Sequence, residues 1–477
     1  MRLLHLSLLL IVLLPSLTNA QVQPAPKVTV TVAADPKGAD LPPYFLGLSY
    51  ESSLLLPQGD RYYFDAGDDA LINMFKTLGI RSLRVGANAV DDPRIPIPRE
   101  KDIDALFAFA KAADVKVIYS FRLKNGDPSE SARLASYIAA HYADQLDCFA
   151  IGNEPNFYIK TYEPFFRLWK PHYDAILKAV PDARIEGPSS FEAKFPIRLA
   201  KDLFAQGHLA MVSNHYYFLG SGRAAEKDPA AARARFLSDM DGAYRNEYKK
   251  TGAVLAGMGV PYRIDELNSC YNGGAKDSSD TFASSLWALS CIHWWAAHHL
   301  VGMNFHTGES VGRDGKFGPA NYAAFVHQAD GQGFAIRPQG YGYLAFSQGA
   351  QGRPLAVTVG AQSGFPIAAY AYQDHAGSFF VTLINRSFGE KAEAASVSIR
   401  LPEGTSAGVW NRLDLVQKEQ DIAAKGDITL GGAPVDARGN WPGHWETIES
   451  ATSATLTVQL PAASAAILRF ANERQPR

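Results

Sequence analysis

The segment Cys148-Phe149-Ala150-Ile151-Gly152-Asn153-Glu154-Pro155 joins a short apolar run to a carboxylate and a proline. A continuous apolar run of this length is typical of a strand buried on both faces of a parallel sheet. Pro155 cannot extend the hydrogen bonding of such a strand. The pattern therefore places Glu154 at the C-terminal end of a buried strand, which is where α/β barrels carry their catalytic groups.

A second segment, Pro261-Tyr262-Arg263-Ile264-Asp265-Glu266-Leu267-Asn268, also has a carboxylate near the end of a predicted strand, 112 residues further along the chain. Two carboxylates at one barrel mouth are the groups that glycoside hydrolysis requires, one as acid/base and one as nucleophile. Strict alternation along the strand would turn Asp265 away from the mouth, so Glu266 is favoured as nucleophile. The sequence thus predicts a catalytic pair, Glu154 as acid/base and Glu266 as nucleophile.

Further apolar runs on both sides of these segments alternate with helical patterns such as those of residues 102–113 and 282–298. Eight such units predict a (β/α)8 TIM barrel over residues 41–350. A doubly wound open sheet is the weaker alternative, because no Gly-rich phosphate loop opens the first unit. The predicted strands are residues 44–51, 82–87, 115–121, 148–154, 184–188, 211–217, 262–267 and 303–306.

Beyond residue 350 the apolar residues recur with a period of two, and Gly, Pro, Asn and Asp interrupt the runs. This pattern predicts a C-terminal antiparallel β-sandwich domain over residues 351–477. The run from Val28 to Val32 alternates in the same way although it precedes the barrel. We therefore expect residues 21–40 to supply an N-terminal strand to that sandwich.

Residues 1–20 have the features of a cleavable signal peptide: a basic start, an apolar centre and small residues before Ala20. Cleavage after Ala20 predicts a secreted or periplasmic protein. No later apolar run is long enough to cross a bilayer, so we expect no membrane insertion of the mature chain. The net charge of −2 gives no reason to expect a nucleic acid partner.

The three cysteines, Cys148, Cys270 and Cys291, show no zinc-site or redox-pair spacing. A disulfide between Cys270 and Cys291 stays open at this stage. We expect no cofactor and no metal.

Polar side chains gather at the predicted strand ends, and in a barrel these ends converge on one mouth. Arg84 and Tyr216 are expected to hydrogen-bond Glu266 and keep it ionised. Asn153 is expected to bind a sugar hydroxyl. The set comprises Glu51, Arg84, Asn88, Asn153, Glu154, His215, Tyr216, Asp265, Glu266 and His306.

Asn153-Glu154-Pro155 together with Glu266 resembles the retaining glycoside hydrolases of clan A. The stretch from Glu266 to Gly274, Glu-Leu-Asn-Ser-Cys-Tyr-Asn-Gly-Gly, is similar to the nucleophile segment of glycoside hydrolase family 79, which contains β-glucuronidases and heparanase. The resemblance implies that the Tyr271 hydroxyl and the backbone N–H of Gly273 bind the C6 carboxylate of a uronic acid.

Other segments resemble the same family. Residues 45–51 are similar to its first strand, which implies that Glu51 binds ring hydroxyls. Residues 84–88 are similar to its second strand, although Ala87 and Asn88 replace a commoner Gly-Thr pair, and Asn88 is implied to contact substrate. Residues 214–217 and 302–306 look like its sixth and eighth strands, and Tyr322 is a further implied site residue.

These observations predict a retaining exo-β-glucuronidase acting on glycans or glycoconjugates that contain terminal glucuronic acid. Three alternatives stay open: an endo-acting, heparanase-like enzyme, a clan A glycosidase for neutral sugars, and an inactive carbohydrate-binding protein. The aglycone, the linkage, tolerance of a 4-O-methyl group and the oligomeric state are not determined by the sequence.

Overall fold

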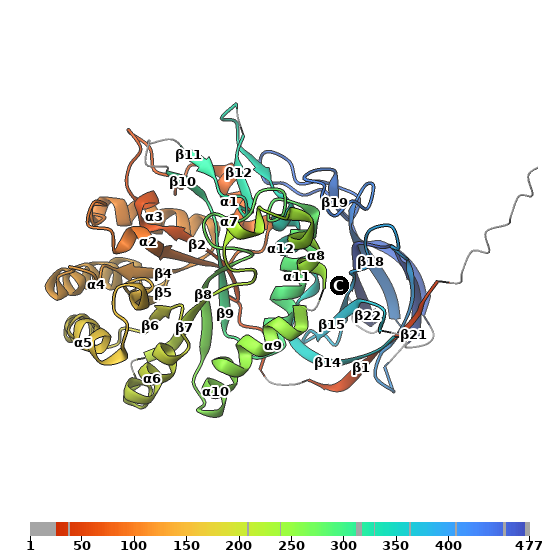
Figure 1. Cartoon of the computed structure of the whole chain (residues 1–477), viewed down its shortest axis with the longest axis horizontal. Coiled ribbons are helices and arrows are strands. Elements are labelled where there is room, and N and C mark those ends of the chain that lie inside the picture. The colour runs from red at the N-terminus through yellow and green to blue at the C-terminus, as the bar shows by residue number, and fades with distance from the viewer. Residues whose placement is uncertain are drawn as a thin grey trace, which may run out of the picture.

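A computed structural model describes residues 25–36, 39–207, 209–238, 240–311, 317–328, 330–361, 364–405, 408–451 and 455–472. The predicted signal peptide, residues 1–20, lies outside these ranges. The barrel and the C-terminal sheet domain lie side by side, with helices α11 and α12 between them (Figure 1).

Eight parallel strands close into a barrel, because the last of them, β9, pairs with the first, β2. The prediction of a (β/α)8 barrel is therefore confirmed, and the open doubly wound sheet is excluded. The strands are β2 (Leu46–Glu51), β3 (Ser82–Gly86), β4 (Lys116–Phe121), β5 (Leu146–Ile151), β6 (Ile185–Ser190), β7 (Leu209–Tyr217), β8 (Tyr262–Asn268) and β9 (Gly302–His306).

Helices cover the outside of the barrel. Helix α3 starts two residues before the predicted Asp102, because the Asp102 side chain accepts from the backbone N–H of Arg99 and caps the first turn. The helices are α1 (Asp69–Thr77), α2 (Ala87–Val90), α3 (Glu100–Ala113), α4 (Pro128–Tyr142), α5 (Tyr162–Ala179), α6 (Lys194–Leu203), α7 (Gly222–Ala225), α8 (Pro229–Leu237), α9 (Met240–Lys250), α10 (Gly252–Gly257), α11 (Phe282–Ala296) and α12 (Pro338–Gly349), with single turns η1 (Ser52–Leu55), η2 (Pro155–Phe157) and η3 (Phe204–Gln206).

Helix α11 is buried along its whole length, which explains why it is apolar on every face. One side packs on the barrel and the other faces the sheet domain, where His293 is bonded to the hydroxyl of Tyr372 (Nδ1 to Oη, 3.0 Å). A single buried core joins the two domains across this helix and includes Phe305 of the barrel and Ile467 of the sheet.

The C-terminal domain is a ten-stranded sheet that folds over a second core, so that Trp410 from one half and Val397 from the other share it. This agrees with the predicted sandwich. The strands are β1 (Lys27–Pro36), β14 (Arg353–Ala361), β15 (Ile367–Gln373), β16 (Phe379–Asn385), β17 (Ala395–Arg400), β18 (Gly408–Gln417), β19 (Ile428–Leu430), β20 (Glu446–Ala451), β21 (Thr455–Leu460) and β22 (Ser464–Asn472).

Strand β1 lies inside this sheet, antiparallel to β14 and parallel to β17. Its alternating valines Val28, Val30 and Val32 are buried in the second core. The predicted N-terminal strand of the sandwich is therefore present.

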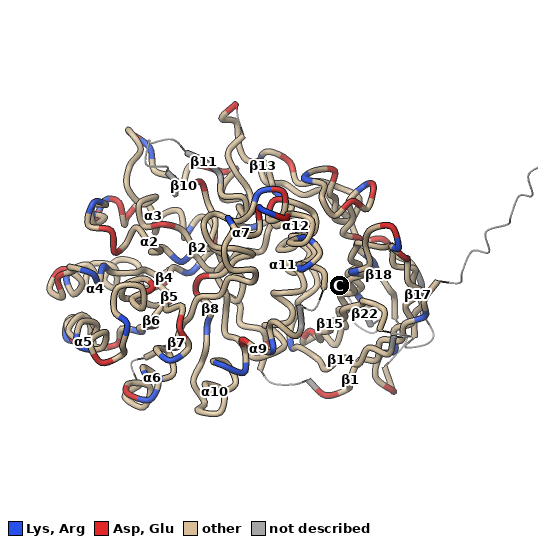
Figure 2. The backbone as a smooth tube through the Cα atoms, in the orientation of Figure 1, with Lys and Arg blue, Asp and Glu red and all other residues tan. Residues whose placement is uncertain are grey.

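Two short hairpins follow β9 near the barrel mouth and extend to the top of Figure 1: β10 (Glu309–Val311) with β11 (Phe317–Pro319), and β12 (Phe325–His327) with β13 (Phe334–Ile336). Basic and acidic residues are intermixed over the outer helices and loops (Figure 2). Within the described ranges, no helix is both long and apolar enough to cross a bilayer.

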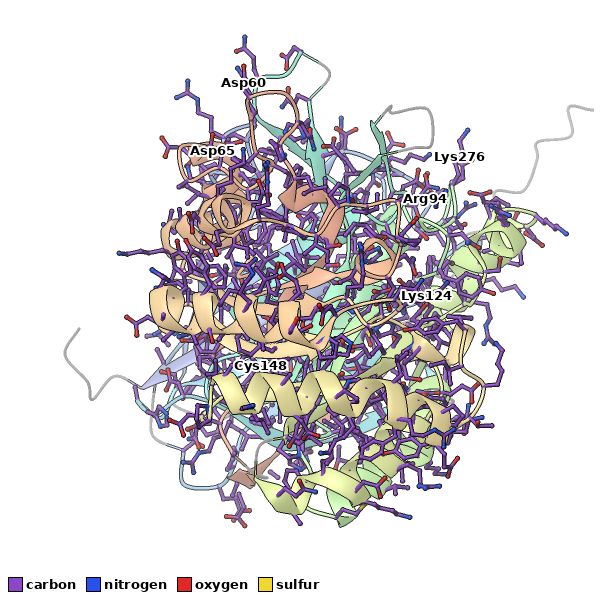
Figure 3. The ribbon with its side chains drawn as sticks, turned by 90° about the vertical axis from the view of Figure 1, so that its left-hand side faces the viewer. Asp60, Asp65, Arg94, Lys124, Cys148 and Lys276 are labelled. Carbon is purple, nitrogen blue, oxygen red and sulfur yellow. The ribbon has the colours of Figure 1, made fainter. Side chains whose placement is uncertain are left out.

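All three cysteines are buried free thiols, so Cys270 and Cys291 form no disulfide. Figure 3 labels Cys148, which lies on β5 inside the layer of helices. Its burial raises the pKa of the thiol, which keeps it in the unreactive protonated form.

Candidate active site

A cavity of about 800 Å³ opens at the C-terminal ends of the barrel strands, where the sequence places the site. It brings together residues from loops after β2, β3, β5, β8 and β9, which are far apart in the chain. Its wall includes Glu51, Asn88, Glu154, Phe157, Phe191, Tyr217, Glu266, Tyr271, Gly273, His306, Glu309 and Tyr322.

Glu154 occupies a left-handed backbone conformation (φ 44°) just after β5. Its N–H donates to the carbonyl of Ser189 (2.8 Å), which fixes this unusual geometry. The side chain is partly exposed to the cavity, and Oε1 lies 2.8 Å from Nδ1 of His215. Glu154 is thus held at the mouth with one oxygen bonded and one free to face a ligand.

Glu266 is buried on β8 between two donors. Nη1 of Arg84 donates to Oε2 (2.7 Å) and the hydroxyl of Tyr217 donates to Oε1 (2.8 Å). Burial alone raises the pKa of Glu266, but the charges of His215, His306 and Arg84 and the Tyr217 hydrogen bond outweigh it and hold the pKa well below the ordinary range. Glu266 is therefore ionised at neutral pH, as a nucleophile must be.

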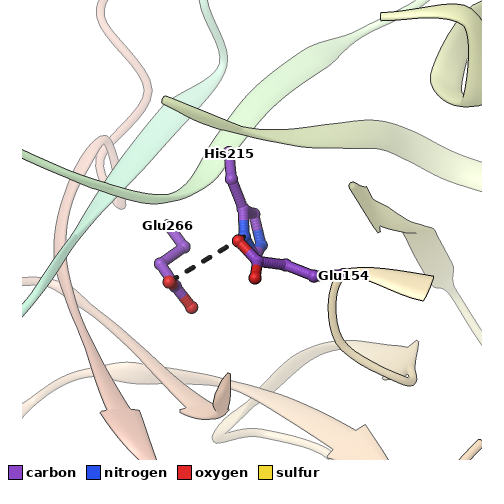
Figure 4. A group of neighbouring side chains, drawn as sticks. All are labelled: Glu154, His215 and Glu266. Atoms are coloured by element: carbon purple, nitrogen blue, oxygen red, sulfur yellow. Dashed lines mark hydrogen bonds and ion pairs between the residues drawn. The ribbon is translucent and has the colours of Figure 1, made fainter. Parts of the chain in front are cut away.

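The two carboxylates face each other, and the ring of His215 lies beside both of them (Figure 4). An oxygen of Glu154 and an oxygen of Glu266 lie within 4.8 Å of each other. Retaining glycosidases hold their carboxyl groups about 5–5.5 Å apart, and inverting enzymes about 6.5–9.5 Å apart to admit a water. The separation fits direct attack by a carboxylate.

His215 was expected only as one polar strand-end residue, and the structure gives it a central place. Burial lowers its pKa, but the negative charges of Glu266 and Asp265 (Nε2 to Oδ1, 3.7 Å) and the hydrogen bond with Glu154 raise the pKa to about 10. The ring is therefore protonated at neutral pH, and Nδ1–H donates to Glu154. The sequence signal that could have predicted this role is the alternation along β7, in which His215 takes an inward position at the C-terminal end of the strand.

The same alternation corrects the prediction for Tyr216. The hydroxyl that donates to Glu266 belongs to Tyr217, whereas Tyr216 packs outside the barrel against Tyr244 and Trp295. Side chains two apart on a strand share a face, so an inward His215 requires an inward Tyr217. Tyr216 is not part of the described cavity wall.

The expected orientation of Asp265 is also wrong. Strand β8 has a bulge against β7, where Asn214 pairs with Ile264 and His215 pairs with Glu266. The extra residue breaks the alternation, so Asp265 and Glu266 both point into the barrel. Asp265 is fully buried beneath Glu266, with Arg84 Nε at 3.4 Å and the Ser189 hydroxyl donating at 2.6 Å. It cannot reach a ligand in the cavity, so Glu266 is the better placed carboxylate.

Arg84 and the asparagines form a second layer around the pair. Nη2 of Arg84 donates to Oδ1 of Asn153 (2.8 Å), and Nδ2 of Asn153 lies 3.4 Å from Oδ1 of Asn88. Arg84 also donates to the Ser49 hydroxyl (3.0 Å). Arg84 thus contacts Glu266 as expected, while Asn88 reaches the cavity wall.

Glu51 ends β2 and faces the cavity close to His306, with Nε2 at 3.8 Å. Its burial raises the pKa, although the neighbouring His306 and the N–H of Ala89, which donates at 2.7 Å, oppose that shift. From this position Glu51 can hydrogen-bond a hydroxyl group of a sugar bound in the cavity.

The loop after β8 brings Tyr271 and Gly273 to the rim of the cavity, beside Tyr322, whose neighbour Asn321 donates its N–H to the carbonyl of Gly273 (2.6 Å). Gly273 has φ 80°, a conformation that favours glycine, and no atom crowds the position of a Cβ. The Tyr271 ring is 40% exposed, whereas Tyr322 is buried. All three residues implied by the resemblance therefore border one cavity.

Within the described part of the chain, one group of side chains has potential metal-ligand atoms within 4.8 Å of one another, and it consists of Glu154, His215 and Glu266. Each carboxylate of this group already has a protein partner: Glu154 is bonded to His215 (2.8 Å), and Glu266 accepts from Arg84 (2.7 Å) and Tyr217 (2.8 Å). This arrangement suits proton transfer and carboxylate attack.

Comparison with known proteins identifies the fold. No protein-family model and no curated protein matches the chain. Among solved structures, a 4-O-α-L-rhamnosyl-β-D-glucuronidase from Fusarium oxysporum in complex with Rha-GlcA is similar, with 17% identity and a TM-score of 0.69 over 92% of this chain and 99% of that one.

Two further structures are similar along their whole lengths. The family 51 arabinofuranosidase from Xanthomonas axonopodis has 14% identity and a TM-score of 0.68, over 93% of this chain and 100% of that one. The family 51 α-L-arabinofuranosidase from Bifidobacterium longum has 15% identity and a TM-score of 0.68, over 94% and 100%. The chain thus shares the barrel-and-sandwich architecture of these enzymes.

Proposed function

We propose that the chain is a retaining glycoside hydrolase that releases terminal β-D-glucuronic acid. The observation that carries this proposal is the Glu154–Glu266 pair at the barrel mouth, with an oxygen of each carboxylate within 4.8 Å of the other and with Glu266 held ionised. Glu266 attacks the anomeric carbon while Glu154 protonates the departing oxygen, which gives a covalent glycosyl-enzyme. Water, deprotonated by Glu154, then releases the sugar with net retention.

The charges around the pair suit this division of roles. Arg84 and protonated His215 balance two carboxylates, those of Asp265 and Glu266. Because Glu266 is held ionised, Glu154 is the member of the pair left to supply the proton.

The uronic acid specificity rests on the Tyr271–Gly273 loop. No Lys or Arg borders the described wall of the large cavity, so a C6 carboxylate would be bound by hydroxyl and backbone N–H donors. The Fusarium structure, described as a glucuronidase, supports a uronoside substrate for this fold.

A neutral glycone is the second candidate, and the absence of Lys and Arg from the described wall of the cavity favours it. Similar solved structures are described as arabinofuranosidases. A neutral-sugar enzyme would keep Glu154 and Glu266 in the same roles and lose only the carboxylate contact of Tyr271.

The deciding experiment compares hydrolysis of p-nitrophenyl β-glucuronide, β-glucoside, β-xyloside and α-L-arabinofuranoside. We expect the glucuronide to be preferred, and Tyr271→Phe to lower its kcat/KM selectively. Preference for a neutral glycoside would overturn the uronic acid proposal. No turnover of any of them, with release of oligosaccharides from a polymer, would indicate endo action; binding without hydrolysis would indicate a carbohydrate-binding protein.

The nucleophile is tested separately. Glu266→Ala is expected to abolish turnover, and turnover near that of the wild type would refute the mechanism. Glu154→Ala is expected to retain activity only toward glycosides with good leaving groups, because these need no proton.

We also propose that the chain is exported after cleavage following Ala20. N-terminal sequencing of protein from the medium or periplasm should begin at Gln21. An intact Met1 on the intracellular protein would contradict this.

A further inference from the structure

A second cavity, of about 390 Å³, adjoins the large one on the side of Glu154. Glu154, Asn88 and Phe157 border both cavities, whereas Glu266 borders only the large one. A glycoside bound for attack places its anomeric carbon at Glu266 and its departing oxygen at Glu154. The group attached to that oxygen then extends past Glu154 into the smaller cavity.

The smaller cavity is held together by one buried carboxylate. Oδ1 of Asp91 accepts from the N–H groups of Leu123 and Lys124 (2.8 and 2.9 Å), and Oδ2 accepts from the N–H of Asn153 and the hydroxyl of Tyr158 (both 3.0 Å). These four donors lie on the loops after β4 and β5. Asp91 therefore fixes Lys124 and Tyr158 relative to the residue that precedes Glu154.

The charged side chains that line this cavity differ in whether a neighbouring group already neutralises them. Asp91 is saturated by its four donors, and Asp92 is paired with Arg94 through two nitrogens. The ammonium of Lys124 lies over the ring of Tyr158, 5.3 Å from its centre, and no described carboxylate pairs with it. Arg94 and Lys124 project on the mouth side of the barrel (Figure 3). Lys124 is thus the uncompensated cation of the cavity.

An apolar surface lies beside this charge. Phe157 is 60% exposed, the most exposed large apolar side chain of the described chain, and it stands between the two cavities. An exposed aromatic face beside a polar cavity is suited to packing against a sugar or aryl ring.

We propose that the smaller cavity is the leaving-group subsite and that Lys124 makes it selective for a leaving group that carries a carboxylate or a similar anion. The inference rests on the proposed function only in taking Glu154 as the acid; it does not depend on which glycone is bound. The expected ligand is a ring, packed on Phe157, whose anionic substituent reaches Lys124.

The test uses two aryl glycosides that differ only in charge, the 4-carboxyphenyl and 4-carbamoylphenyl glycosides of whichever glycone the enzyme prefers. Lys124→Met should lower kcat/KM for the carboxylate relative to the amide by about two- to fivefold, mainly through KM, as for removal of one solvent-exposed ion pair. Lys124→Arg should restore the ratio, and added salt should reduce it in the wild type. Lys111→Met, an exposed lysine on α3, is the matched control.

The outcomes separate this inference from the proposed function. Wild-type turnover of both aryl glycosides with an unchanged ratio in Lys124→Met would overturn the inference and leave the glycosidase intact. No turnover of any glycoside would instead overturn the proposed function, and the subsite with it. A second pair of substrates, disaccharides whose leaving group is either a uronic acid or the matching neutral sugar, shows which kind of molecule carries the anion. If the enzyme prefers the charged member of both pairs, the natural leaving group is an acidic sugar. If it prefers the charged member of the aryl pair alone, the natural leaving group is an aromatic acid.

Discussion

Tyr217 is one of the groups that lower the pKa of Glu266, and its hydroxyl can be removed without removing a charge. Its hydrogen bond favours the ionised carboxylate, so Tyr217→Phe should raise the pKa of Glu266. Since Glu266 must be ionised to attack, the acidic limb of the kcat/KM profile should move up by roughly 0.5–1 pH unit. Tyr216→Phe, with its ring outside the barrel, is the neighbouring control. An acidic limb that stays in place in Tyr217→Phe would mean that this bond does not tune the nucleophile.

His215 should make stability depend on pH with a definite sign. Its pKa is raised from 6.5 to about 10 in the folded protein, so folding favours the protonated ring. The resulting contribution to the free energy of unfolding is fully present below about pH 6.5 and is lost as the pH rises through about 10. The difference in unfolding free energy between wild type and His215→Asn should therefore shrink over this range in urea titrations. A difference that grows with pH would contradict the assignment.

The sequence predicted both glutamates of the pair because each lies near the C-terminal end of a predicted strand, and this position changes little if the strand's bounds are wrong by a residue. The predictions for Tyr216 and Asp265 were wrong, because they depend on which face of the strand each side chain occupies. Asp265 points inward because of a bulge between two specific strands, which depends on how β7 and β8 pair. Such a pairing detail leaves no mark in the residues of one strand alone.

Strand β1 is the element whose contribution to stability is easiest to isolate. Val30 is fully buried between β14 and β17, so Val30→Ala should lower the unfolding free energy by about 1.5–3 kcal/mol. Thr31→Ala, on the exposed face of the same strand, should change it by less than about 0.5 kcal/mol. Thermal and urea unfolding of the two variants would check this, and equal effects would mean that the strand is not packed as described.

The eight barrel strands could be predicted as elements, because parallel strands buried on both faces are nearly continuous in apolar residues. Their ends were less certain. The fourth was expected to run to Glu154, but β5 ends at Ile151, after which Gly152 and Glu154 both have positive φ. A strand's apolar pattern does not report where its backbone turns, and it is this turn that aims Glu154 at the cavity.

For the whole molecule we predict a single unfolding transition. The barrel and the sheet domain share a core across α11 and α12, and both His293 and its partner Tyr372 are buried at the junction. Neither domain can separate without exposing that surface, so calorimetric and van't Hoff enthalpies should agree in the full-length protein. Two resolved transitions would show that the domains unfold independently.

Because β1 is made first and its neighbour β14 begins at Arg353, the molecule cannot complete its sheet until most of the chain has been synthesised. At about 5–20 residues per second, the ribosome needs roughly 15–65 s to reach that point. During that interval an alternating valine strand has no edge to join, and it is open to pairing with other nascent chains. The fold therefore places a demand on chaperones early in translation, and slowing translation between the two strands should lower the yield of soluble protein.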